Sequence, residues 1–198
     1  MSFYLIRHAD KEDGEYYSTR LPLNNQPLSE NGLIQAQKLI EYFQKIEVSQ
    51  IFVSEYIRTL QTIESVSKMK NITPIIDKRL NEINIGDTDR LTDQEIENRF
   101  PEFWRAYIER INDFRFPNGE SGEEAGARIF EIFQSIDINK NTIFVAHDGI
   151  IRTLICKILG MATYKRHHFR IDLCSITTCE YQNELKSWQI SKLNYSIN

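Results

Sequence analysis

Apolar residues recur along this chain in two different patterns. Four short runs rich in apolar residues predict strands, at residues 3–6, 51–53, 73–76 and 142–146. The first run is continuously apolar and predicts a strand buried on both faces of a sheet. Segments with helical character follow the first, second and fourth runs, at residues 33–43, 55–68 and 149–159. The tail, residues 173–181 and 188–193, predicts a hairpin or edge strands. Strands alternating with helices predict an α/β fold, and we expect a three-layer sandwich with a mostly parallel central sheet flanked by helices.

The middle of the chain interrupts this alternation. Capping-box patterns begin at Thr92 and at Ser121, and a further helix is predicted over residues 101–112. We therefore expect residues 91–119 to form a small helical cap inserted into a single domain that spans residues 1–198.

Composition narrows the classes of partner. The 198 residues are 41% hydrophobic and 26% charged, as in ordinary globular proteins, and the formal net charge is −4. An acidic chain argues against nucleic acid or an anionic membrane as the main partner, although a pocket inside it can still be basic. No apolar run is long enough to span a bilayer. Three cysteines without C-x-x-C spacing fit a reducing compartment, so we expect a cytoplasmic protein.

Two histidines and two arginines are predicted to meet at one edge of the sheet. Arg7 and His8 end the first strand, Arg58 lies just after the second, and His147 ends the fourth. Ligands of open α/β sheets bind at the carboxyl ends of the strands. Taken singly, a histidine at the end of a strand is structural about as often as it is functional, and an arginine in the first turn of a helix is usually a solvated side chain.

The combination of these four residues favours an anion. Unpaired imidazoles and guanidiniums repel one another, whereas phosphate is bound by arginine forks and by the backbone N–H groups of a helix start such as Asp148-Gly149. A metal site is the alternative. It fits poorly because metal ligands do not usually include arginines and no H-x-H or H-E-x-x-H spacing occurs, so we expect no metal.

Six segments occur in order between Tyr4 and about Gly160. They are Leu5–Ala9, Pro27–Gly32, Ser54–Thr62, Leu80–Glu82 with Gly86, Phe116–Ser121 and Val145–Arg152. This series resembles the motifs of the histidine phosphatase superfamily, which includes cofactor-dependent phosphoglycerate mutases. The chain departs from the family pattern at Ala9 and Asp148, which stand where the family has glycines. Around Asp13–Glu15 it shows no counterpart of the asparagine that commonly contacts the phosphate.

The resemblance implies a role for each matching residue. His8 would attack phosphorus, and the phosphate would be held by Arg7, His8, Arg58, His147 and Asp148. Glu82 would be the general acid, with weaker candidates in Glu12, Asp13, Glu15 and Asp148. The two arginines should lower the pKa of His8 and so keep it neutral. No cofactor is implied.

These roles imply a metal-independent phosphomonoesterase that hydrolyses a small phosphorylated metabolite through a phosphohistidine on His8, of the broad-specificity or α-ribazole-phosphate type. One alternative is phosphoglycerate mutase-type phosphoryl transfer, although such mutases are usually longer. Another is a non-catalytic phosphate-binding or signalling module, which normally loses the nucleophile or an arginine. A protein-phosphohistidine phosphatase is a third, and it would suit a site without a cap. The sequence leaves open whether two copies form a homodimer.

Two segments are expected to form the walls of the substrate site, residues 10–25 and residues 104–116. Within the second, Trp104 and Tyr107 are expected to pack in the core of the cap, while Arg110 and Arg115 either reach a second anionic group or are solvated. The basic patch at residues 166–168 is expected to be a surface cluster.

Overall fold

The computed structural model describes residues 1–12 and 26–197, and in this part the strands form one sheet. The strands are β1 (Ser2–Arg7), β2 (Gln50–Val53), β3 (Ile75–Ile76), β4 (Thr142–Ala146), β5 (Ile176–Gln182) and β6 (Ser187–Tyr195). Their order is β3-β2-β4-β1-β5-β6. The first four are mutually parallel, and β5 and β6 each run antiparallel to their predecessor in this order. The prediction of a mostly parallel sheet is confirmed.

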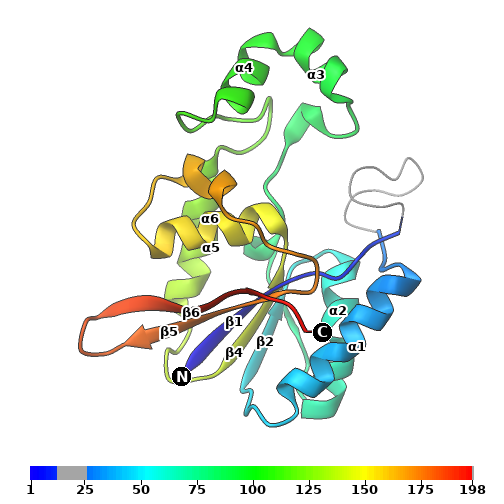
Figure 1. Cartoon of the computed structure of the whole chain (residues 1–198), viewed down its shortest axis with the longest axis vertical. Coiled ribbons are helices and arrows are strands. Elements are labelled where there is room, and N and C mark those ends of the chain that lie inside the picture. Colours follow the sequence, from blue (N-terminus) through cyan, green and yellow to red (C-terminus); the bar gives the residue numbers. More distant parts are fainter. Residues whose placement is uncertain (13–25, 198) are drawn as a thin grey trace.

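Helices cover both faces of the sheet (Figure 1). Helices α1 (Glu30–Phe43) and α2 (Ile57–Lys70) lie on one face, and α5 (Gly122–Ser135) and α6 (Asp148–Ile158) lie on the other. The continuous apolar run of β1 explains this arrangement, because successive side chains of a strand point to opposite faces. Tyr4 and Ile6 pack with α1 and α2, whereas Phe3 and Leu5 pack with α5 and α6. The three-layer sandwich is confirmed.

The predicted helix starts are formed by the expected side chains. The hydroxyl of Ser29 accepts from the N–H of Gly32 at the start of α1. Complete capping boxes open α3 (Asp93–Arg99) at Thr92 and α5 at Ser121. Such caps satisfy backbone N–H groups that have no partner inside the helix.

Two elements are shorter than predicted. Strand β3 keeps only Ile75 and Ile76 of the predicted run, and both are exposed at the edge of the sheet. Helix α4 (Pro101–Glu109) ends before residue 112, because Arg110 adopts a left-handed backbone conformation with φ of 51°. A residue in that conformation cannot continue a right-handed helix.

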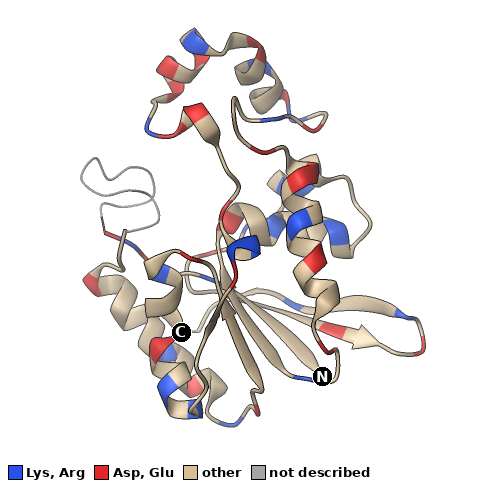
Figure 2. Ribbon diagram, turned by 180° about the vertical axis from the view of Figure 1, so that it is seen from behind, with Lys and Arg blue, Asp and Glu red and all other residues tan. Residues whose placement is uncertain are grey.

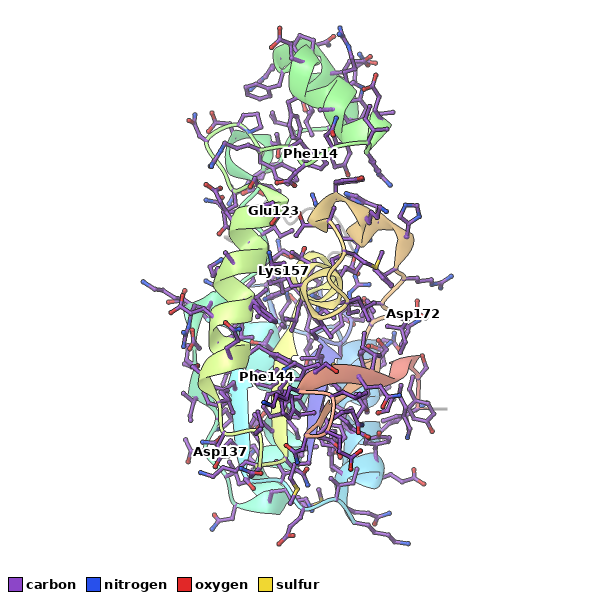
Figure 3. All side chains as sticks on the ribbon, turned by 90° about the vertical axis from the view of Figure 1, so that its left-hand side faces the viewer. Phe114, Glu123, Asp137, Phe144, Lys157 and Asp172 are labelled. Atoms are coloured by element: carbon purple, nitrogen blue, oxygen red, sulfur yellow. The ribbon has the colours of Figure 1, made fainter. Side chains whose placement is uncertain are left out.

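Helices α3 and α4 stand apart from the sheet, beyond the ends of α5 and α6 (Figure 1). Phe103, Tyr107, Phe114 and Phe116 form an aromatic cluster at the base of these two helices, with ring centroids 5.1–6.3 Å apart. Phe114 is the buried member of the cluster (Figure 3). That residues 91–119 form a cap inserted into a single domain stays a prediction. Trp104 and Tyr107 stack on each other but stay half-exposed, so their prediction as cap core is only partly right.

Charged side chains lie on the helices and loops, while the central strands are almost devoid of them (Figure 2). Side chains of both signs are interspersed on these helices and loops. Within residues 1–12 and 26–197, no helix has both the length and the apolar character needed to cross a bilayer.

Candidate active site

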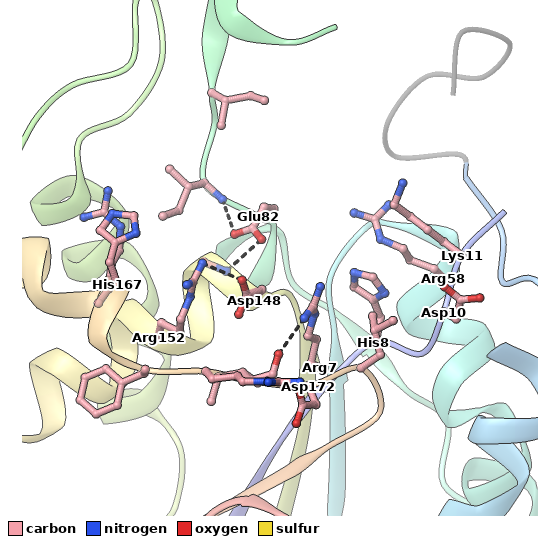
Figure 4. Close-up of a pocket in the computed structure, with 18 of the residues that line it drawn as sticks. Arg7, His8, Asp10, Lys11, Arg58, Glu82, Asp148, Arg152, His167 and Asp172 are labelled. Carbon is pink, nitrogen blue, oxygen red and sulfur yellow. Dashed lines mark hydrogen bonds and ion pairs between the residues drawn. The ribbon is translucent and has the colours of Figure 1, made fainter. Parts of the chain in front are cut away.

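A pocket of about 630 Å³ opens where β1 and β4 end and α2 and α6 begin (Figure 4). Its lining includes most of the predicted site residues, namely Arg7, His8, Arg58, Glu82 and Asp148. His147 is fully buried next to them, with its ring centroid 5.1 Å from that of His8. The parallel strands therefore bring together residues that are far apart in the sequence, as the strand-end argument predicted.

The ring of His8 is held in one orientation by the backbone. Its Nδ1 lies 2.7 Å from the carbonyl oxygen of Ala9, which can only accept, so Nδ1 carries the hydrogen and Nε2 keeps its lone pair. Burial, followed by the charges of Arg58 and Arg7, holds the pKa of His8 well below its ordinary value. His8 is thus a neutral imidazole, the form that can act as a nucleophile.

His147 is fixed by partners on both ring nitrogens. The Arg58 guanidinium can only donate, so its contact of 3.2 Å makes Nδ1 of His147 the acceptor. Nε2 then donates to the hydroxyl of Ser54, 2.8 Å away, and that hydroxyl lies 3.0 Å from the hydroxyl of Thr59. Burial and the charge of Arg58 keep the pKa of His147 well below its ordinary value, so this ring is neutral as well.

Tyr56 contacts two members of the site and was not singled out from the sequence. The Arg58 Cζ lies 4.4 Å from the centre of the Tyr56 ring, and the rings of Tyr56 and His147 are 4.6 Å apart. Burial lowers the pKa of Arg58 to about 10, so the aromatic face supplies part of the stabilisation that water would otherwise give to this cation. Its signal in the sequence is an aromatic residue two positions before Arg58, inside the segment that begins with Ser54.

We expect Tyr56→Leu to weaken phosphate binding and turnover, because Arg58 and His147 lose the aromatic surface that positions them. A cation–π contact of this kind is worth about 0.5–2 kcal/mol, which corresponds to a loss of roughly 2- to 30-fold in kcat/KM. Tyr56→Phe keeps the ring and is the matched control. Steady-state kinetics with p-nitrophenyl phosphate measures both variants, and equal losses in the two would contradict a role for the ring.

Glu82 lies at the wall of the pocket, at the amino end of α6. Its carboxylate accepts from the backbone N–H groups of Ile83, Gly149 and Ile150 at 2.9–3.0 Å. An anion is favoured at a helix N-terminus, where backbone N–H groups lack partners inside the helix. Glu82 and His8 both line the pocket, and the role of Glu82 as general acid stays a prediction.

The carboxylate of Asp148 is engaged by a neighbour on its own helix. It lies 2.6 Å from Nη2 of Arg152, one turn along α6. Two anionic oxygens would repel a phosphate, so a phosphate contact by Asp148 would have to come from its backbone N–H at the first position of α6. The predicted phosphate binding by Asp148 stays a prediction.

Other predicted residues lie elsewhere. Glu12 is exposed and does not line the pocket, and Asp13, Glu15 and the remainder of the predicted wall through residue 25 lie outside the described residues. Arg110 bonds the backbone of Tyr107, and Arg115 bonds Glu124 and the carbonyl of Gly119. Neither arginine lines the pocket, which favours their interpretation as surface charges.

The prediction of a surface cluster at residues 166–168 is wrong for two of its three members. Arg166 is only 2% exposed and lines the pocket together with His167, and only His168 is exposed. The reason is the turn η4 (Thr163–His168), which packs against α5 and α6 and directs Arg166 onto the ring of Phe114. The pocket also contains Lys11 and Arg152, which the sequence analysis did not assign.

Comparisons with known proteins agree with this geometry. A family model described as "Histidine phosphatase superfamily (branch 1)" matches residues 3–196. A relative from Proteus mirabilis, named "Probable phosphoglycerate mutase GpmB", is 29% identical over 92% of this chain and 86% of its own length.

Two solved structures show the same fold. The α-ribazole phosphatase from Shigella flexneri has a TM-score of 0.82 and 25% identity, over 100% of this chain and 98% of its own. A mycobacterial glucosyl-3-phosphoglycerate phosphatase has a TM-score of 0.80 and 22% identity, over 98% of this chain and 99% of its own, and this likeness speaks for the fold alone. The match across nearly the whole chain, together with the predicted motifs, places the protein in the histidine phosphatase superfamily.

Proposed function

We propose that this chain is a phosphomonoesterase that hydrolyses a small phosphorylated metabolite through a phosphohistidine on His8, without a metal. The observation that carries the proposal is a neutral His8 whose Nδ1 is bonded to the Ala9 carbonyl, beside two arginines and a second buried histidine. This combination supplies a nucleophile and the charges that a phosphoryl group requires.

In the first step, Glu82 enters in its protonated form, Nε2 of His8 attacks phosphorus, the P–O bond to the leaving group breaks, and Glu82 gives its proton to the departing oxygen. Arg7 and Arg58 stabilise the charge on the other phosphoryl oxygens, while His147 orients Arg58 through its Nδ1. Direct phosphate binding by His147 stays a prediction, because it would require the ring to exchange its Ser54 or Arg58 contact for the phosphate. In the second step, Glu82 takes a proton from water, whose oxygen attacks phosphorus and breaks the N–P bond. The products are inorganic phosphate, an alcohol and the original enzyme.

A mutase is the second candidate, supported by the name of the Proteus mirabilis relative. Both activities share the phosphohistidine and differ in the acceptor, which is water in one and a second substrate molecule in the other. Incubation with a bisphosphoglycerate separates them. A phosphatase releases inorganic phosphate, whereas a mutase keeps the phosphoryl group on the protein and passes it to a monophosphoglycerate. A non-catalytic module is disfavoured because the nucleophile and both arginines are present.

We expect hydrolysis of a panel of phosphorylated metabolites to survive EDTA and to be blocked by vanadate, because arginines meet the charge that a metal would otherwise meet. Release of inorganic phosphate measures this directly. Loss of activity in EDTA with recovery on adding zinc or magnesium would contradict the metal-independent mechanism. The cytoplasmic location and a homodimer also stay predictions.

A further inference from the structure

A second group of basic side chains lines the pocket away from the nucleophile. It consists of Arg152, Arg166 and His167, which we call the distal cluster. Figure 4 shows Arg152 and His167 on one side of the pocket, and His8 and Arg58 on the other. The proposed hydrolysis uses none of the distal cluster, so its presence in the wall requires another explanation.

Arg166 is a buried cation with incomplete compensation. Its Nη1 donates to the carbonyl of Thr163 at 3.1 Å, its Cζ lies 4.9 Å from the centre of the Phe114 ring, and its nearest carboxylate, Asp113, is 3.7 Å away. That carboxylate already accepts from the backbone N–H groups of Gly122 and Glu123 at 3.0 Å. Burying a guanidinium is costly unless its donors are satisfied.

The other two members have buried nitrogens without partners. Within residues 1–12 and 26–197, Nε of Arg152 and Nε2 of His167 are buried and make no hydrogen bond. Buried polar atoms of native proteins are nearly always hydrogen-bonded, so two such atoms in the wall of one pocket point to a ligand. Burial, followed by the charges of Arg166 and Arg110, lowers the pKa of His167 to about 3.

The acidic side chains near the distal cluster are already engaged. Asp148 pairs with Nη2 of Arg152, and Glu82 caps the amino end of α6. Neither carboxylate forms a hydrogen bond with Nε of Arg152 or Nε2 of His167. The two atoms that remain without a partner are ring or guanidinium nitrogens, which can donate an N–H. The complementary group of a ligand is therefore a hydrogen-bond acceptor. Because two guanidiniums lie beside it, we expect this acceptor to be an anion.

We propose that the distal cluster binds a second anionic group of the substrate, so that this enzyme acts on phosphomonoesters that carry a carboxylate or a second phosphate at their other end. This inference rests on the proposed phosphatase activity of the same pocket. The distal cluster lies across the pocket from His8 and Arg58 (Figure 4), so the two anionic groups should be separated by a spacer, which Ile83, Phe116 and Phe169 in the pocket wall can cover.

Calorimetric titration with phosphonates tests the distal cluster without requiring hydrolysis. A phosphonate has a C–P bond in place of the P–O bond that the proposed reaction breaks, so the ligand stays intact during the titration. Alkane bisphosphonates from propane to hexane, and the ω-carboxyalkyl phosphonates of the same lengths, are compared with alkyl monophosphonates. We expect at least one bisanionic ligand to bind about tenfold or more tightly than its monophosphonate, since only the bisanionic ligand can also make charge-assisted hydrogen bonds to the distal cluster. The carboxylate and bisphosphonate series show which second group is preferred.

Two variants locate the effect. Arg152→Gln and His167→Phe should each bring the ratio of the two dissociation constants close to one, and Arg170→Gln, which changes an exposed arginine of the same pocket, should preserve it. Because Arg166 is buried, its substitution could unfold the chain, so it is left unchanged.

Equal binding of all mono- and bisanionic ligands to the wild-type protein would overturn the inference, and so would a preference that survives in both variants. If phosphonates show the preference but no phosphoester is hydrolysed, the phosphatase proposal fails while the anion-binding cluster stands.

Discussion

His8→Ala is expected to abolish turnover of every phosphomonoester. The substitution removes the atom that attacks phosphorus, and loss of a catalytic nucleophile typically costs about 10⁴-fold or more in kcat. The fold should persist, because the hydrogen bond of the His8 ring to the carbonyl of Ala9 joins neighbouring residues and not distant segments. Initial rates with p-nitrophenyl phosphate, together with circular dichroism, measure both effects.

His168→Ala is the matched control for this substitution, since it removes an exposed histidine that does not line the pocket. It should keep wild-type activity. Hydrolysis by His8→Ala at the wild-type rate would rule out His8 as the nucleophile and direct attention to the buried His147.

Glu82→Gln is expected to cost far more with alkyl phosphates than with p-nitrophenyl phosphate. An alkoxide is a strongly basic leaving group that needs a proton, whereas p-nitrophenolate departs with little help, and general acid catalysis is typically worth about 10²–10⁴ in rate. The ratio of the kcat/KM values for the two substrates, in variant and wild type, is the measurement. An equal loss on both substrates would make Glu82 a positioning residue.

The cap that Glu82 provides to α6 is a second reason for using two substrates. Glutamine keeps one oxygen acceptor but replaces the other by an amide that donates, so one of the bonds to Gly149 and Ile150 is lost as well. Such a loss lowers activity toward all substrates alike. Asp148→Asn is the parallel variant, because it removes the other candidate acid on the same helix end and should show no dependence on the leaving group.

Much of the fold was predictable because its signals are local. The continuous apolar runs of β1 and β4 can be satisfied only between two layers of helices, and Ser29, Thr92 and Ser121 each mark a helix start by their own hydrogen bonds. Arg7, His8 and His147 followed from the rule that parallel strands present their carboxyl ends at one edge.

The features that were missed depend on packing between distant segments. Whether Arg166 is solvated or buried depends on η4 lying against Phe114, across about fifty residues of sequence, and composition suggests the exposed alternative. Likewise, Tyr56 becomes part of the site only because β4 places His147 beside it.

Detection of the phosphorylated enzyme tests the central claim most directly. The wild-type protein is mixed with excess p-nitrophenyl phosphate, quenched in alkali, in which phosphohistidine is stable, and analysed by mass spectrometry of the peptide that contains His8. We predict one phosphoryl group on His8 that is lost in acid and is absent from His8→Ala. Turnover with the phosphoryl group on another residue, or with none on the protein at any time during the reaction, would contradict the mechanism.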